Sequence, residues 1–206
     1  AWKRANPVGS LVLLRSHHEL FGLATVAFLG YLAHAVLPST AVLYMSYRYG
    51  WDTTSVGLML AVVGVAAMVV QGVLVRPLTA RFGERRTLLA GLLCGAVGFT
   101  IYGVAPQGWI FCLGIPIIAF WGLAGPATQA LMSRRVSGSE QGQLQGAMAS
   151  INGVTGLIGP TLFTQIFSHF INAPDGWGLP GAPFLLAAGL LLSGVGLAWR
   201  VTGPRS

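Results

Sequence analysis

The chain has 206 residues, of which 54% are hydrophobic and only 8% are charged, and its formal net charge is +7. Soluble domains carry about a quarter charged residues, so this composition excludes a water-soluble fold and predicts an integral membrane protein. The basic residues lie in short segments between apolar runs, a pattern that sets orientation in a membrane and argues against nucleic acid as a partner.

Six apolar runs approach the length of about 20 residues that a transmembrane helix needs. Their hydrophobicity does not alternate, which disfavours β-barrel strands and favours an all-α bundle. The bundle is predicted to cover residues 20–200, between a cytoplasmic lead (1–19), taken as the remnant of a central loop, and a cytoplasmic tail (201–206). The six spans are predicted at about 20–44, 55–75, 88–105, 109–131, 143–168 and 183–199.

The first span carries His34, the only ionisable side chain near the middle of any predicted span. Histidine titrates near neutral pH, with an ordinary pKa of about 6.5, so His34 is a candidate for exchanging a proton in a transport pathway. A neutral histidine that forms hydrogen bonds between helices is the alternative. Both interpretations stay open at this point.

Between the second and third spans, the segment Gly72–Arg86 holds four of the twelve Lys and Arg residues. A loop is predicted here, with Thr87 capping the third span. With six spans, eleven basic residues fall on one side of the membrane and only Arg48 on the other. The excess of positive charge on the cytoplasmic side predicts that both termini are cytoplasmic.

In the third span, Gly91, Gly95 and Gly98 share one face, the small-residue spacing that lets helices approach closely in lipid. Ser137 and Glu140 have the spacing of a capping box at the start of the fifth span. Glu140 is expected either to act only as this cap or to pair with basic residues at the same face of the membrane. In the second case it forms a latch with Arg81, Arg85 and Arg86.

Prolines interrupt three spans, and each is expected to bend its helix, as a gating hinge or as a static kink. These are Pro38, Pro126 and Pro160. The stretch Pro38–Arg48 resembles Pro126–Arg135 when one gap is allowed. The two stretches run in opposite directions through the membrane, which indicates two inverted three-helix repeats.

Arg81–Arg86, which includes Gly83, resembles the loop motif of the major facilitator superfamily, with Ala80 where the motif has an acid. Further segments resemble the tetracycline-resistance branch of drug–proton antiporters: Ala5–Leu11, Tyr47–Asp52, Glu140–Gly146 and Gly159–Phe163. The resemblance covers nearly the whole chain but only the carboxy-terminal six-helix half of such a transporter. It implies an amino-terminal half as partner, or a second copy.

The resemblance also implies a pathway between the first, fourth and fifth spans, where Tyr31, Trp121 and Asn152 lie at similar depth to His34. Packing is the alternative role for Trp121. Members of the branch that export tetracycline are expected to carry an acid and a histidine at the positions that match Gly95 and Ala67. Their absence argues against tetracycline as the substrate.

The predicted function is one half of a secondary transporter of the bacterial inner membrane that exports a lipophilic, drug-like small molecule in exchange for protons. The alternative is a half-size membrane domain that works as a homodimer or with a partner subunit. An intramembrane enzyme is disfavoured because the sequence has no Gly-x-Ser-Gly turn and no paired intramembrane acids. No cofactor or metal is expected, since no HExxH motif and no cysteine cluster occur.

Overall fold

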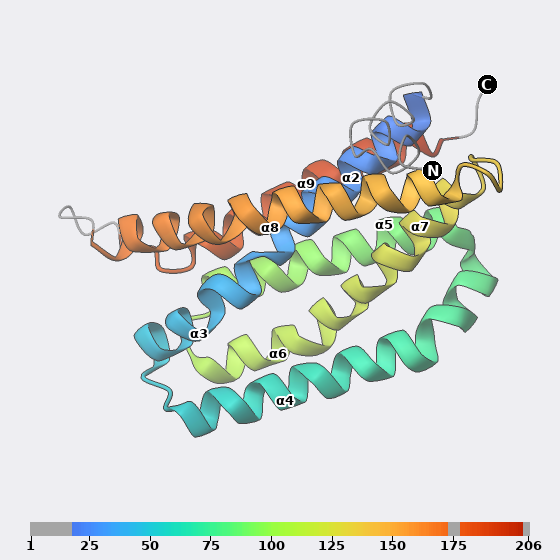
Figure 1. Cartoon of the computed structure of the whole chain (residues 1–206). Helices are drawn as coiled ribbons and strands as arrows, with labels where there is room; N and C mark the ends of the chain where they lie inside the picture. Colours follow the sequence, from blue (N-terminus) through green and yellow to red (C-terminus); the bar gives the residue numbers. More distant parts are fainter. Residues whose placement is uncertain (1–17, 173–177, 204–206) are drawn as a thin grey trace.

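A computed structural model of the chain describes residues 18–172 and 178–203, and these residues form a bundle of long helices (Figure 1). Five helical stretches are long and apolar enough to cross a membrane, which confirms the prediction of an all-α membrane protein. The helices are α2 (His18–His34), α3 (Val36–Tyr49), α4 (Thr53–Val69), α5 (Val75–Val104), α6 (Gly108–Ala119), α7 (Ala124–Ser133), α8 (Gln141–Ile171) and α9 (Ala182–Val201), with a π segment η2 (Val70–Leu74) and a 3-10 segment η3 (Phe120–Leu123).

The most extensive helix packing brings together elements that are far apart in the sequence, because α9 lies side by side with both α2 and α5 (Figure 1). Their facing sides bury large apolar residues such as Leu23, Leu88 and Leu191, each with no exposed surface. Helix α8 packs along α2 and α3, whereas α4 lies at the rim and packs mainly on α6. Most of the α4 surface is therefore uncovered in this chain.

The predicted small-residue face of the third span is a site of close helix packing. A Cβ atom on Gly91 would lie 2.9 Å from the backbone nitrogen of Ala124, and one on Gly98 would lie 2.6 Å from Cβ of Ile118. The absence of side chains here lets α5 press directly against the α6–η3–α7 element.

The basic segment expected as a loop is helical except at Gly83, which corrects the prediction. The helical stretch Thr53–Val104 holds 52 residues, more than twice what one span needs, and it turns back through this segment, so that α4 and most of α5 are separate helices (Figure 1). Gly83 has φ 78° and ψ 161°, a left-handed conformation that breaks the helix within α5 and suits glycine. Thr87 does not cap a helix start. Its hydroxyl donates to the carbonyl oxygen of Gly83, 2.8 Å away, because the chain is already helical there.

Pro38 and Pro126 each follow a break between two helical segments. Helix α2 ends at His34 and α3 begins two residues later, while η3 separates α6 from α7. Each proline is the third residue of the second segment, and each is followed two positions later by a buried threonine, Thr40 or Thr128. The two broken helices thus match in detail around the residues that the sequence comparison aligned.

Other prolines have different effects. Helix α8 continues through Pro160, and α6 through Pro116. The π segment, in which the backbone N–H of Val75 donates to the carbonyl of Val70, ends shortly before Pro77. Proline has no N–H for the ladder and crowds the carbonyl four residues back, and a π turn relieves this locally.

Candidate functional site

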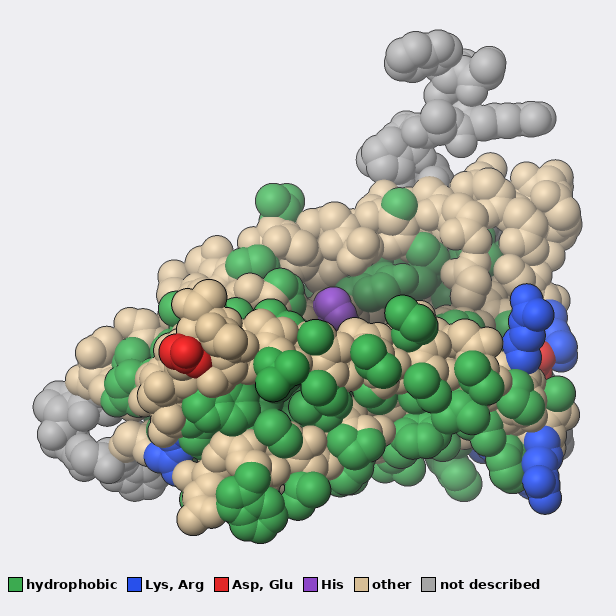
Figure 2. All heavy atoms as spheres, turned by 90° about the horizontal axis from the view of Figure 1, so that it is seen from below, with side chains coloured by type: hydrophobic (Ala, Val, Ile, Leu, Met, Phe, Trp, Pro, Cys, Tyr) green, Lys and Arg blue, Asp and Glu red, His purple; other side chains and the backbone are tan. Residues whose placement is uncertain are grey.

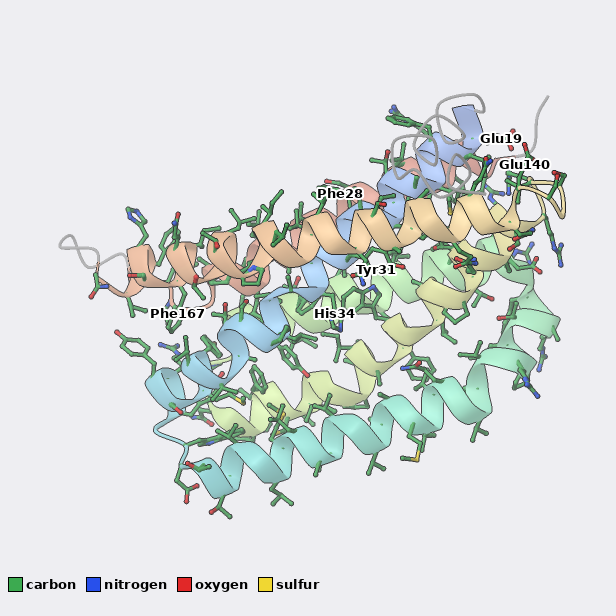
Figure 3. All side chains as sticks on the ribbon, in the orientation of Figure 1. Glu19, Phe28, Tyr31, His34, Glu140 and Phe167 are labelled. Carbon is green, nitrogen blue, oxygen red and sulfur yellow. The ribbon has the colours of Figure 1, made fainter. Side chains whose placement is uncertain are left out.

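A cavity of about 370 Å³ lies between the first broken helix, the α4–η2 stretch and the second broken helix. Figure 3 shows Tyr31 and His34 on the first of these elements, pointing toward the interior of the bundle. The cavity reaches the molecular surface, and its wall is mostly apolar, as is usual for small-molecule sites. Its lining residues come from α2, α3, α4, η2, α5, α6, η3, α7 and α8.

Three of the four residues predicted for the pathway line this cavity. Tyr31, His34 and Trp121 belong to its wall, together with Pro126 at the start of α7. Asn152 is not part of the wall. It lies on an exposed face of α8. The α8 residue that does line the cavity is Met148, one turn earlier.

Trp121 is the residue that joins the cavity to the packed core. Its ring centroid lies 5.6 Å from that of His34 and 5.3 Å from that of Phe99. Behind it stands Gly95, where a Cβ atom would lie 2.8 Å from Cγ of Trp121 and 2.7 Å from Cδ1 of Leu191. The indole therefore fills the space that a side chain at position 95 would need.

Two glutamines belong to the cavity wall and were missed from the sequence. Gln71 lies in η2, and Gln129 lies on α7. The side-chain nitrogen of Gln129 is buried and has no hydrogen-bond partner among the described residues. A carboxamide within an apolar helix is the signal that the sequence offers for both, and the same signal led to Asn152, which lies outside the wall.

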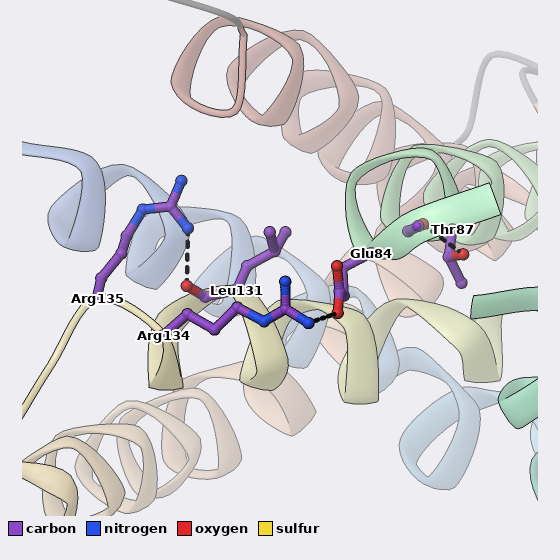
Figure 4. Close-up of polar contacts among 6 residues, drawn as sticks. Glu84, Thr87, Leu131, Arg134 and Arg135 are labelled. Atoms are coloured by element: carbon purple, nitrogen blue, oxygen red, sulfur yellow. Dashed lines mark hydrogen bonds and ion pairs between the residues drawn. The ribbon is translucent and has the colours of Figure 1, made fainter. Parts of the chain in front are cut away.

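At one end of the molecule the basic residues gather with their acidic partners. In Figure 2 the Lys and Arg side chains are concentrated at one end of an otherwise largely hydrophobic face. Arg134 pairs with Glu84 at 2.5 Å, and Arg135 pairs with Glu19 at 2.6 Å. The guanidinium of Arg135 also donates to the carbonyl of Leu131, 2.7 Å away (Figure 4). These contacts connect α7 to the break at Gly83 and to the start of α2.

The structure does not bring Glu140 together with the arginines of the basic segment. One carboxylate oxygen of Glu140 accepts hydrogen bonds from the backbone N–H and the hydroxyl of Ser137, at 2.9 and 2.7 Å, which is the carboxylate half of the predicted capping box. Helix α8 begins only at Gln141, so Ser137 lies in the turn before the helix and is not its N-cap. Arg81 lies over the ring of Phe82. Arg85 lies over the ring of Trp199 and donates to the hydroxyl of Thr202 at 3.1 Å, which ties α5 to the end of α9.

Comparison with known proteins gives the same picture from sequence and from structure. The sequence profile described as Major Facilitator Superfamily matches residues 23–206. The tetracycline resistance protein of class G from Vibrio anguillarum is 36% identical over 81% of this chain and 43% of its own length. The class C protein from Escherichia coli is 33% identical over 94% of this chain and 49% of its own length.

Similarity extends to animal proteins and to a solved structure. Hippocampus abundant transcript-like protein 1 of Mus musculus is 29% identical over 93% of this chain and 41% of its own length. The crystal structure of the human organic anion transporter MFSD10 (TETRAN) superposes with a TM-score of 0.72 at 20% identity, over 86% of this chain and 40% of that one. The chain thus spans about half the length of the relatives it matches or less.

Proposed function

This chain belongs to the Major Facilitator Superfamily, and from that premise we propose that it is the carboxy-terminal half of a proton-coupled exporter of lipophilic, drug-like small molecules. The family consists of membrane transporters rather than enzymes. The observation that carries the finer proposal is the mostly apolar cavity with His34 in its wall. Such a wall suits a lipophilic ligand, and the histidine supplies a group that can exchange a proton near neutral pH.

The proposed substrate is not tetracycline, although several relatives are named for resistance to it. The positions where the resemblance leads us to expect an acid and a histidine hold Gly95 and Ala67. An acid at position 95 would collide with Trp121 and Leu191. Ala67 lines the cavity without a titratable group. His34 is the remaining candidate for proton coupling in this half.

Alternating access in this proposal needs a second six-helix half, either an amino-terminal one in the same polypeptide or a second copy. Support comes from the outward apolar faces of α4 and α8, where Leu58 and Leu157 are 69% and 80% exposed. The basic end would face the cytoplasm of a bacterium, with the chain in the inner membrane and both termini inside. A contact of Glu140 with Arg81, Arg85 or Arg86 stays a prediction, for an access state other than the one described here.

The test is efflux of a fluorescent lipophilic probe from cells or vesicles that contain the protein with its natural flanking sequence. Collapse of the pH gradient should stop efflux. His34→Gln keeps a side chain able to form hydrogen bonds but cannot exchange a proton, whereas His34→Ala removes both properties. Loss of pH dependence in both variants supports proton coupling. Efflux that persists without a gradient, or normal pH dependence in His34→Ala, would contradict it.

The second candidate function is a half-size domain that acts as a homodimer or with a separate subunit. The same exposed faces of α4 and α8 favour it, because either partner would cover them. Cross-linking in native membranes distinguishes the two cases. A cross-linked band at twice the mass of the chain supports the homodimer, and a single polypeptide of twice the length supports the two-half transporter.

A further inference from the structure

The polar groups of the cavity wall are uncharged, apart from the titratable His34. Among the described lining residues there is no Asp, Glu, Lys or Arg. Moving a cation into such a site without a counter-charge costs far more than moving a neutral molecule of the same shape. The wall described here therefore offers no counter-charge to a permanently cationic ligand.

The carboxamide of Gln129 is a buried wall group with unused hydrogen-bonding capacity. Its nitrogen is shielded from solvent and has no partner among the described residues. The neighbouring hydroxyl of Thr128 already donates to the carbonyl of Ala124, 2.8 Å away. A buried donor without a partner is unfavourable, so an acceptor brought into the cavity by a ligand would recover that free energy. Gln129 belongs to the cavity wall, and the terminal torsion of glutamine is broad, so its amide can adjust to a ligand.

The largest aromatic group of the wall is held in place from behind. The Trp121 indole is packed against Phe99 and fills the space at Gly95, while its neighbour His34 lies 5.6 Å away, centroid to centroid. A ring system that enters the cavity meets a Trp121 ring that is already ordered, with the more exposed Tyr31 ring also in the wall. Aromatic contacts of this kind favour planar, apolar partners.

We propose that this cavity takes an uncharged, planar aromatic compound that carries a carbonyl oxygen, with the oxygen accepting a hydrogen bond from the Gln129 amide and the rings against Tyr31 and Trp121. This inference rests on the proposed function and names its substrate class. It predicts that a neutral carbonyl compound is preferred over a cation of the same ring size.

The test uses the whole chain in lipid nanodiscs, with saturable binding of two tricyclic probes measured by equilibrium dialysis against empty nanodiscs. The probes are acridone, which is neutral and has a ring carbonyl, and 9-aminoacridine, which is a cation at neutral pH. Acridone should bind at least about tenfold more tightly, and Gln129→Leu should weaken acridone about tenfold, as expected for one lost hydrogen bond. Gln129→Glu should reverse the preference toward 9-aminoacridine.

Gln165→Leu is the matched control, because Gln165 is an exposed glutamine of α8 outside the cavity wall. Acridone binding by this variant should equal that of the unchanged chain. Equal or tighter binding of 9-aminoacridine by the unchanged chain overturns the proposal, and so does full acridone affinity in a folded Gln129→Leu variant. Binding is measured without a pH gradient, so a chain that binds acridone yet shows no gradient-driven efflux refutes the proposed function and not this inference.

Discussion

At the scale of single residues, Tyr44 and Tyr102 differ in how their hydroxyls are used, although both are buried within one aromatic cluster. The Tyr44 hydroxyl donates to the backbone carbonyl of Tyr102 at 2.9 Å. In a continuing helix that carbonyl would accept from residue 106, but residue 106 is a proline without an N–H. The Tyr102 hydroxyl has no partner among the described residues.

Phenylalanine substitutions at these two positions should therefore have unequal effects. Tyr44→Phe should lower the free energy of unfolding by about 1–2 kcal/mol, because it leaves a buried carbonyl without its donor. Tyr102→Phe should leave it unchanged or raise it, because the substitution removes an unpaired hydroxyl. Thermal unfolding of the detergent-solubilised chain, followed by circular dichroism, measures both. Equal destabilisation by the two variants would show that the hydrogen bonding of the hydroxyls does not determine how each tyrosine contributes to stability.

Gly95 gives a second prediction at this scale. Gly95→Ala should destabilise the chain by about 1–3 kcal/mol, because the new methyl group would lie within 3 Å of Trp121 and Leu191 and the core would be overpacked. Gly189→Ala in α9 is the control, since nothing lies within 4 Å of a Cβ atom there and alanine is the better helix former. The same unfolding experiment should show the first variant less stable and the control unchanged or more stable. A stable Gly95→Ala variant would mean that Trp121 is free to move.

At the scale of elements, the start of α4 depends on Asp52. Its carboxylate accepts a hydrogen bond from the backbone N–H of Ser55 at 2.9 Å, which makes Asp52 the N-cap of this helix. Hydrogen bonds from the side chain and backbone of Ser55 hold the pKa of Asp52 below its usual value. A carboxyl group with a lowered pKa in the folded state stabilises that state above the unfolded pKa, about 3.9, and loses the contribution as pH falls through the folded value.

The first turn of α4 should therefore fray when the pH falls below about 4. Amide hydrogen exchange at Ser55 and Val56 measures this, and exchange, corrected for the intrinsic pH dependence, should accelerate in acid. Asp52→Asn keeps a capping side chain and should abolish the pH step. Asp52→Ala should give fast exchange at every pH. A pH step that survives in the Asn variant would assign it to another group.

For the whole molecule, the ion pair between Glu84 and Arg134 joins the break in α5 to the end of α7. The Glu84 side chain is 19% exposed and that of Arg134 is 70% exposed, so the pair is partly screened by solvent and is worth no more than about 1 kcal/mol. That free energy still corresponds to about a fivefold change in an equilibrium between two access states.

Glu84→Arg should shift this equilibrium by up to about fivefold. The double variant Glu84→Arg with Arg134→Glu should restore it. Labelling of a cysteine placed in the cavity wall, measured from each side of the membrane, reports the ratio of the two states. Arg200→Gln, an exposed arginine at the same end of the chain, is the control. If the double variant behaves like the single one, the charges act separately and not as a pair.

Much of this architecture follows from local properties of the sequence. The lengths of the apolar runs, the breaks before Pro38 and Pro126 and the cap at Asp52 all depend on residues close together in the chain. The helical course of the basic segment was not predicted, because good helix formers surround Gly83 and only its backbone conformation marks the break.

Only part of the cavity wall could be predicted from the sequence, because the direction of a side chain depends on how the helices pack. Depth along a helix led to Tyr31, His34 and Trp121, which line the cavity, but depth does not say which way a side chain faces. Asn152 therefore fell outside the wall. The direction of the Gln71 side chain depends on the π segment, which no pattern in the sequence predicts. The direction of the Gln129 side chain depends on how α7 packs against its neighbours.

The π segment Val70–Leu74 has a consequence for how the length of this protein can vary. A π turn holds one residue more than an α-helix of the same rise, so it marks where a residue can be gained or lost. Removing one residue there would convert the turn to ordinary α-helix and leave the packed faces of α4 and α5 in register. Removing one elsewhere in either helix would rotate everything beyond it by about 100° and turn a packed face toward lipid. Natural variants one residue shorter in this region should therefore carry the deletion between Val70 and Leu74, with residue 71 turned away from the cavity.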